Sequence, residues 1–451
     1  MSIIKEIPEI LRISREQYEK CITDFSEIPL RMEECITGPE GLTEKNNFLF
    51  HGDNMEVMRY LLNFKEMKNK IQLIYIDPPF FSNADYNISI KTLSKNIKIL
   101  PIKHKVYRDT WDKGLTEYLV MLCTRLFLMK DLLNEKGSIF LHLDHHSVHY
   151  AKIFMDEIFG HNNFRNEIIW SYKSGGSSKK QFSRKHDTIL FYTKSPQYTF
   201  HPLKEKSYNR GLKPYHFKGV EEYEDEKGWY TVVNMKDVWS IDMVGRTSGE
   251  RVEYATQKPE ALIKRMVEAC SAEGDLCADF FGGSGTLAAV ASKCGRRWIT
   301  CDKSHIASLS THKRLLETKS PYEYYSLWTE EVSGEKENDF DIHIEINQED
   351  DQQVRVSLIG FKYNNDDSIP CHERYKEAIK TIMKEDSLEL IAYWSIDPDY
   401  DHRVLTPTWY SSKSKGKMEK EALVKQKNKK DIAVRVVDIF GQVKLQILDT
   451  L

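Results

Sequence analysis

The stretch Ile71-Gln72-Leu73-Ile74-Tyr75-Ile76-Asp77-Pro78-Pro79-Phe80 decides the expected fold of this chain. Its first six residues form an apolar run typical of a strand buried on both faces of a parallel sheet. A carboxylate at the carboxyl end of such a strand points into the crevice where open α/β sheets bind ligands. The stretch therefore predicts an α/β fold with Asp77 at its binding edge.

The residues Asp77, Pro78, Pro79 and Phe80 combine three chemical features. The two prolines fix the backbone and lack N–H donors, so the carbonyls around them are free to accept from another group. Phe80 adds a flat ring beside those acceptors. An acidic acceptor, a rigid carbonyl and a ring suit a planar group that bears an exocyclic NH2. The alternative is a simple strand-ending turn, because Asp-Pro is common in turns.

The whole chain has 451 residues, enough for two or three domains, and a net charge of −3. Its eight cysteines form no Cys-x-x-Cys pair, which argues against a zinc site and for a reducing compartment. We predict no metal. The chain shows no apolar signal core and no apolar run of membrane-spanning length, so we expect a cytoplasmic protein without a membrane partner.

From residue 48 to about residue 316, apolar strands alternate with helices, which predicts a doubly wound, Rossmann-like sheet. We expect strands at 48–51, 71–76, 138–143, 166–171, 188–193, 276–281 and 297–301. We expect helices at 54–63, 115–134, 147–158, 259–272, 285–294 and 303–316. The predicted organisation is a helical lead (1–45), an α/β domain (46–330) with an inserted recognition segment (172–250), and a small β-rich C-terminal domain (331–451).

The inserted segment carries the densest positive charge. The stretch from Arg165 to Lys218 contains twelve lysine and arginine residues but only three acidic residues. Tyrosines and phenylalanines are interleaved with them. A solvated loop explains most charge runs, but basic and aromatic residues together favour a nucleic-acid surface. The residues predicted to contact nucleic acid are Lys179, Lys180, Arg184 and Lys185.

A second motif, Asp279-Phe280-Phe281-Gly282-Gly283-Ser284-Gly285-Thr286, follows a predicted strand and opens a helix. Glycines allow a tight turn and a close ligand, and the helix N-terminus presents free N–H groups. Asp302 ends the next strand, where a carboxylate commonly grips ribose hydroxyls. Capping of the following helix is the other reading of Asp302, and the two roles are compatible.

Two shorter motifs also begin helices. His51-Gly52-Asp53-Asn54 places Asp53 where it either faces an adenine ring or caps the helix. Thr256-Gln257-Lys258-Pro259 places a proline in a favoured first-turn position, and Lys258 there either meets a cofactor carboxylate or serves only in capping.

Taken together, these motifs resemble the amino-methyltransferases of DNA, in the permuted arrangement called the β group. The Asp-Pro-Pro-aromatic motif comes first, and Thr-Gln-Lys-Pro and the glycine motif follow the recognition segment. The resemblance is strongest to type III modification subunits and related adenine methyltransferases. The segment 137–144 and the tail 433–441 also resemble segments of these enzymes.

The resemblance implies S-adenosyl-L-methionine as cofactor and double-stranded DNA as substrate. It implies that Phe80 stacks on a flipped base, that Asp77 and the Pro78 carbonyl accept from its NH2, and that Pro79 completes the catalytic motif. A restriction or defence subunit and a second copy of the chain are the partners it suggests. The cofactor-binding residues it implies are Asp53, Thr256, Lys258, Asp279, Phe281, Gly283, Ser284, Gly285, Thr286 and Asp302.

The expected activity is methylation of adenine N6 in restriction-modification or phage defence. Cytosine-N4 methylation uses the same chemistry, but Asp at the first motif position fits adenine enzymes better than the Ser common in cytosine-N4 enzymes. A catalytically idle DNA-binding subunit is the third hypothesis. The intact Asp77 and glycine motif argue against it.

Overall fold

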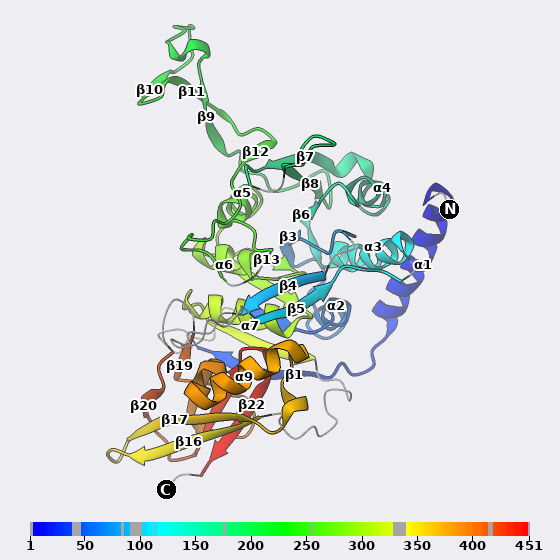
Figure 1. Ribbon diagram of the computed structural model, residues 1–451. Helices are drawn as coiled ribbons and strands as arrows, with labels where there is room; N and C mark the ends of the chain where they lie inside the picture. The colour runs from blue at the N-terminus through cyan, green and yellow to red at the C-terminus, as the bar shows by residue number, and fades with distance from the viewer. Residues whose placement is uncertain are drawn as a thin grey trace.

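A ten-stranded sheet forms the body of the molecule (Figure 1). The computed structural model describes residues 3–37, 47–82, 85–90, 102–112, 114–174, 177–252, 254, 256–327, 340–413 and 418–449. Strand β3 (Ile71–Ile76) lies inside this sheet, and all six of its residues are buried, as its unbroken apolar run predicts. The strands follow one another in the order β1-β15-β2-β14-β13-β3-β6-β8-β7-β12.

The six strands from β15 to β6 run parallel, and β8 is antiparallel to both of its neighbours. Besides β3, the sheet contains β1 (Leu30–Ile36), β15 (Tyr322–Leu327), β2 (Phe48–His51), β14 (Arg297–Asp302), β13 (Leu276–Asp279), β6 (Leu133–Leu143), β8 (His186–Thr193), β7 (Phe164–Ser171) and β12 (Val238–Ser240).

Helices cover both faces of the sheet, because side chains alternate along each strand. In β3, Ile74 and Ile76 belong to the core beneath one set of helices, and Leu73 and Tyr75 to the core beneath the other. The first set is α1 (Ile3–Thr23), α2 (Asn54–Asn63), α3 (Leu115–Leu132) and α4 (Val148–Phe159). The second is α5 (Glu260–Cys270), α6 (Thr286–Lys293) and α7 (His305–Leu316).

This architecture confirms the predicted doubly wound α/β fold, and two boundaries differ from expectation. The lead at 1–45 is not only helical, because β1 pairs with β15 at the edge of the sheet. The segment 172–250 is not one continuous insertion, because β8 and β12 both return to the sheet. Both β1 and β12 gain their place by pairing with strands distant in sequence, which local patterns do not reveal.

The rest of the segment 172–250 forms a small sheet of β9 (Lys204–Tyr208), β11 (Gly228–Asn234) and β10 (Tyr223–Asp225). It stands away from the body beyond β12 (Figure 1). A further hairpin of β4 (Asp85–Ile90) and β5 (Ile102–Arg108) follows the Asp77–Phe80 motif. Within the described residues, no helix combines the length and apolar character needed to cross a membrane.

The C-terminal region is built from two antiparallel sheets and helix α9 (Glu373–Asp386) around their own apolar core. One sheet contains β16 (Phe340–Gln348), β17 (Gln353–Tyr363) and β20 (Glu421–Lys425). The other contains β19 (Trp409–Ser412), β18 (Ile391–Tyr400), β21 (Asp431–Asp438) and β22 (Val443–Leu448). Ile306 and Ile102 belong to the same core, so α7 and the β4–β5 hairpin both contact this region.

A buried ion pair joins β1 to the C-terminal region. Glu34 is fully buried, and its Oε2 lies 3.0 Å from Nη1 of Arg435 on β21. Its other oxygen, Oε1, accepts from the Tyr393 hydroxyl at 2.8 Å and the Ser395 hydroxyl at 2.6 Å. A buried carboxylate is stable only while its partners compensate its charge, so the folding of the C-terminal region is coupled to β1 at the edge of the main sheet.

We predict that Glu34→Ala lowers the free energy of unfolding by about 3–5 kcal/mol, because it leaves the Arg435 charge buried and uncompensated. Denaturant titration followed by circular dichroism measures the loss. The control is Glu27→Ala, at an exposed residue, which should stay within about 0.5 kcal/mol of wild type. Equal stability of the two variants would contradict the coupling.

Candidate active site

Four acidic side chains meet at one edge of the sheet. Strands β2, β14, β13 and β3 are successive neighbours and run parallel, so their carboxyl ends lie side by side. Asp279 and Asp302 are the last residues of β13 and β14. Asp77 follows β3 directly, and Asp53 lies two residues beyond β2.

These four residues line a single cavity of ≈ 620 Å³. The cavity joins the Asp77–Phe80 motif to nearly all the predicted cofactor residues, since Thr256, Lys258, Phe281, Gly283, Ser284 and Thr286 also line it. Gly285 does not line it. Gly285 is instead the left-handed residue (φ 69°) that begins α6.

The two oxygens of Asp77 have different surroundings. Oδ2 forms an ion pair with Lys258 Nζ, which also lies 5.5 Å from the centre of the Phe80 ring. Oδ1 is buried, and no described residue donates a hydrogen bond to it. A buried carboxylate oxygen without a donor is costly, so this atom is suited to accept from a bound molecule.

The glycine turn is held by Asp302. Its Oδ2 accepts from the Gly283 N–H at 2.8 Å, and its Oδ1 accepts from the Ser304 N–H at 2.8 Å. Ser304, not Asp302, is the N-cap of α7. A Cβ at Gly282 would collide with the Thr300 hydroxyl, so a larger residue there would require the Thr300 side chain to move.

Asp53 caps α2, because its Oδ1 accepts from the Met55 N–H at 2.9 Å. It also pairs with Arg125 of α3, whose Nη2 lies 3.1 Å from the same oxygen. Asn54 donates to the Phe280 carbonyl at 2.7 Å and so ties the start of α2 to the end of β13. The capping role predicted for Asp53 is therefore present, and its face toward the cavity remains available.

Burial shapes the charge of the cavity. It raises the pKa of Asp279 well above the usual value of a carboxyl, although the Phe281 N–H donates to Asp279 Oδ1 at 2.9 Å. Burial also raises the pKa of Asp302, against the backbone N–H groups of Ser304, Gly283 and Lys303, which stabilise its charged form. A bound group that carries positive charge or hydroxyl donors would offset these costs.

The predicted DNA-contacting residues lie outside the cavity, in the loop 172–185 between β7 and β8. Lys179, Lys180 and Arg184 are exposed, and Lys185 is half-buried with its Nζ 3.2 Å from the Ser174 carbonyl. Because β8 starts beside the carboxyl end of β6, which is the parallel neighbour of β3, the loop leaves the sheet at the same edge as Asp77.

Several side chains at this edge were not predicted from the sequence. Trp111, Arg125 and Tyr254 line the cavity. Behind the Asp77–Phe80 motif, the His142 ring forms hydrogen bonds with Tyr75 and Asp187. Arg125 and Tyr254 lie in no recognisable motif. A histidine next to the last residue of an apolar strand, as in Phe140-Leu141-His142-Leu143, is a usable signal.

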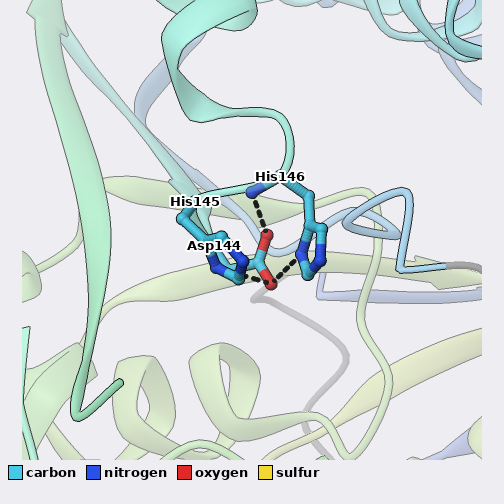
Figure 2. A group of neighbouring side chains, drawn as sticks. All are labelled: Asp144, His145 and His146. Atoms are coloured by element: carbon cyan, nitrogen blue, oxygen red, sulfur yellow. Dashed lines mark hydrogen bonds and ion pairs between the residues drawn. The ribbon is translucent and has the colours of Figure 1, made fainter. Parts of the chain in front are cut away.

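A cluster of potential metal ligands lies just beyond β6, where we predicted no metal. Ligand atoms of Asp144, His145 and His146 all lie within 4.8 Å of one another (Figure 2). Asp144 Oδ1 accepts from the His146 N–H at 2.9 Å, and Asp144 Oδ2 lies 2.7 Å from His146 Nδ1. These contacts are those of an Asx turn that links β6 to α4.

Comparison with known proteins matches residues 71–310 to the N6_N4_Mtase family model, described as DNA methylase. The chain belongs to this DNA methylase family. The match spans the Asp77–Phe80 motif, the recognition segment and the glycine turn, and it confirms the resemblance predicted from the motifs.

Individual relatives include type II and type III enzymes. Type II methyltransferase M.EcaI from Enterobacter cloacae is 26% identical over 354 residues, which cover 65% of this chain and 74% of the relative. The Mod subunit of the type III restriction-modification enzyme EcoP15I from Escherichia coli is 29% identical over 161 residues, covering 34% and 24%. DNA adenine methyltransferase YhdJ from Escherichia coli (strain K12) is 26% identical over 258 residues, covering 56% and 76%.

The cofactor of this family is S-adenosyl-L-methionine, and the cavity fits it. A volume of ≈ 620 Å³ lies in the range of small-molecule sites. Asp302 and Asp53 supply carboxylates for hydroxyl and amine donors, and the turn at Gly283 brings backbone close to the cavity wall. Asp77 also lines the cavity, and its Oδ1 is an acceptor to which no described residue donates.

We predict that Lys258→Met lowers kcat for methyl transfer by about 10-fold to 100-fold, because charge-assisted hydrogen bonds contribute about 1.5–3 kcal/mol. Affinity for S-adenosylmethionine, measured by calorimetry, should stay unchanged. Lys258→Arg should restore much of kcat. The matched control is Lys264→Met, at an exposed lysine on α5.

The opposite pattern would contradict this role of Lys258. If Lys258 binds a cofactor carboxylate, as its motif alone suggests, Lys258→Met should weaken cofactor affinity and leave kcat at saturating cofactor near wild type.

Proposed function

We propose that this chain is a site-specific DNA methyltransferase that modifies the exocyclic N6 of adenine in a flipped-out base. The observation that carries the proposal is the unpartnered Asp77 Oδ1, in a cavity that Phe80 and the glycine turn also line. Relatives named for restriction-modification and for adenine methylation support a role of this kind.

The amine of adenine is a poor nucleophile, since its lone pair is delocalised into the ring. Asp77 Oδ1 and the Pro78 carbonyl accept from the NH2, which favours a more tetrahedral nitrogen and stabilises the positive charge that this atom gains on attack. Lys258 fixes the other oxygen of Asp77 and so limits rotation of the carboxylate. The Phe80 ring stacks on the extruded base.

S-adenosylmethionine, when bound, supplies a methyl group already activated by its sulfonium. Asp302 would hold the ribose hydroxyls of this cofactor, and Asp53 would face its adenine ring. Thr256, Asp279, Phe281, Ser284 and Thr286 form the remaining wall, and Gly283 and Gly285 shape the turn. Alignment of the methyl group with the target nitrogen supplies much of the rate.

Cytosine-N4 methylation is the second candidate, because the matched family covers both amines. The Asp at position 77, where Ser is common in cytosine-N4 enzymes, favours adenine. A restriction or defence subunit, or a second copy of the chain, is the proposed protein partner.

We predict that Asp77→Ala lowers the rate of methyl transfer to DNA by about 100-fold to 1000-fold, since it removes an electrostatic stabiliser of the reacting nitrogen. Calorimetry should show S-adenosylmethionine affinity close to wild type. The control is Asp351→Ala, at an exposed carboxylate far along the chain. Near-normal turnover of Asp77→Ala would show that the catalytic assignment is wrong.

A further prediction concerns the loop 172–185, which we propose tracks the DNA backbone. Replacing Lys179, Lys180, Arg184 and Lys185 by glutamine should weaken DNA binding and flatten its salt dependence. Each lost phosphate contact reduces the slope of log K against log salt by about 0.9. Fluorescence anisotropy over a salt series measures the slope, and cofactor affinity should not change.

The matched control replaces four exposed lysines of the C-terminal region, Lys425, Lys427, Lys429 and Lys430. A loop variant with the wild-type slope would mean that the loop is only solvated. A reduced slope in the control alone would assign the contacts to the C-terminal region.

A further inference from the structure

His142 lies between the catalytic motif and the recognition segment. It is 0% exposed, in β6 beside β3. Its ring centre lies 5.9 Å from that of Phe80 and 5.4 Å from that of Trp170, in an edge-on contact. Its Nδ1 lies 3.9 Å from Asp77 Oδ1. One buried imidazole thus touches both functional side chains of the Asp77–Phe80 motif.

The polar atoms of this imidazole belong to a chain of hydrogen bonds. Tyr75 Oη lies 2.9 Å from His142 Nδ1, and Asp187 Oδ2 lies 3.3 Å from His142 Nε2. The ionised Asp187 carboxylate only accepts, so His142 Nε2 carries the ring hydrogen and donates to it. Nδ1 then accepts from the Tyr75 hydroxyl.

This series of hydrogen bonds ends at the base of the loop 172–185. Asp187 Oδ1 accepts from the Tyr172 hydroxyl at 3.1 Å. Burial alone would raise the pKa of Asp187, but the hydrogen bonds from His142 and Tyr172 and the charge of Lys258 lower it overall, so Asp187 stays an acceptor. Tyr172 is the first residue after β7, and its N–H donates to the Lys185 carbonyl at 3.0 Å.

We propose that His142 is a positioning residue that ties the orientation of Asp77 and Phe80 to the base of the loop 172–185. The inference rests on the proposed function. When the loop binds DNA, a movement of its base shifts Tyr172 and Asp187. Because His142 is hydrogen-bonded to Asp187 and packs beside Phe80 and Asp77, it then shifts these two side chains as well. Misplacement of a reacting group by about 1 Å costs about 100-fold in rate.

The first test separates positioning from cofactor binding. His142→Leu should lower kcat by about 100-fold, with S-adenosylmethionine affinity unchanged. His142→Gln, whose amide still donates toward Asp187, should recover part of kcat. The control is His149→Leu, at an exposed histidine on α4. Circular dichroism and thermal melting establish that each variant folds.

The second test is a double-mutant cycle with Tyr172→Phe, which removes only the hydroxyl at the loop base. It should lower kcat severalfold in wild type and have no further effect in His142→Leu, because each change breaks the same series of hydrogen bonds. Multiplicative effects would overturn the coupling. If His142→Leu fails to fold, Tyr172→Phe and Asp187→Asn decide, and wild-type kcat in both would overturn the proposal.

Failure of this inference differs from failure of the proposed function. Wild-type chain that transfers no methyl group to DNA would overturn the function. Active wild type with unaffected His142 and Tyr172 variants would overturn only the positioning role.

Discussion

The parallel order of β2, β14, β13 and β3 is the constraint on which the site depends. Parallel neighbours must end at the same edge of a sheet, so Asp53, Asp302, Asp279 and Asp77 meet although they lie as far as 249 residues apart in the sequence. The helices that follow these strands, α2, α7 and α6, then begin at this edge and present their first N–H groups to it.

The cost of this arrangement is a concentration of carboxyl groups with little access to water. Lys258 is one of the cations that the structure places among them, and Arg125, which pairs with Asp53, is another. Lys258 pairs with Asp77 directly, and its charge also favours the ionised forms of Asp187 and Asp279. The charge of Lys258 thus stabilises carboxylates both at the Asp77–Phe80 motif and beside the glycine turn.

The sequence predicted the elements that depend on local patterns. The apolar run of β3, the glycine turn before α6 and the helix starts at Asp53 and Pro259 were all assigned within a few residues. Contacts between distant segments were not predicted. Lys258 lies 181 residues from Asp77, and nothing in Thr256-Gln257-Lys258-Pro259 indicates that partner. β1 and the Glu34–Arg435 pair likewise depend on neighbours remote in the chain. His142 was not predicted either, although its place near the end of an apolar strand was a signal for it.

The proposed role of the Asp77 edge of this cavity is to receive an amine of a DNA base. Nucleoside mass spectrometry tests this role on DNA from cells that express this chain alone, beside cells that express Asp77→Ala. We expect N6-methyladenine in the first sample and not in the second. N4-methylcytosine would keep the chemistry and change the base. Absence of both modified bases, with the folded protein present, would contradict the claim.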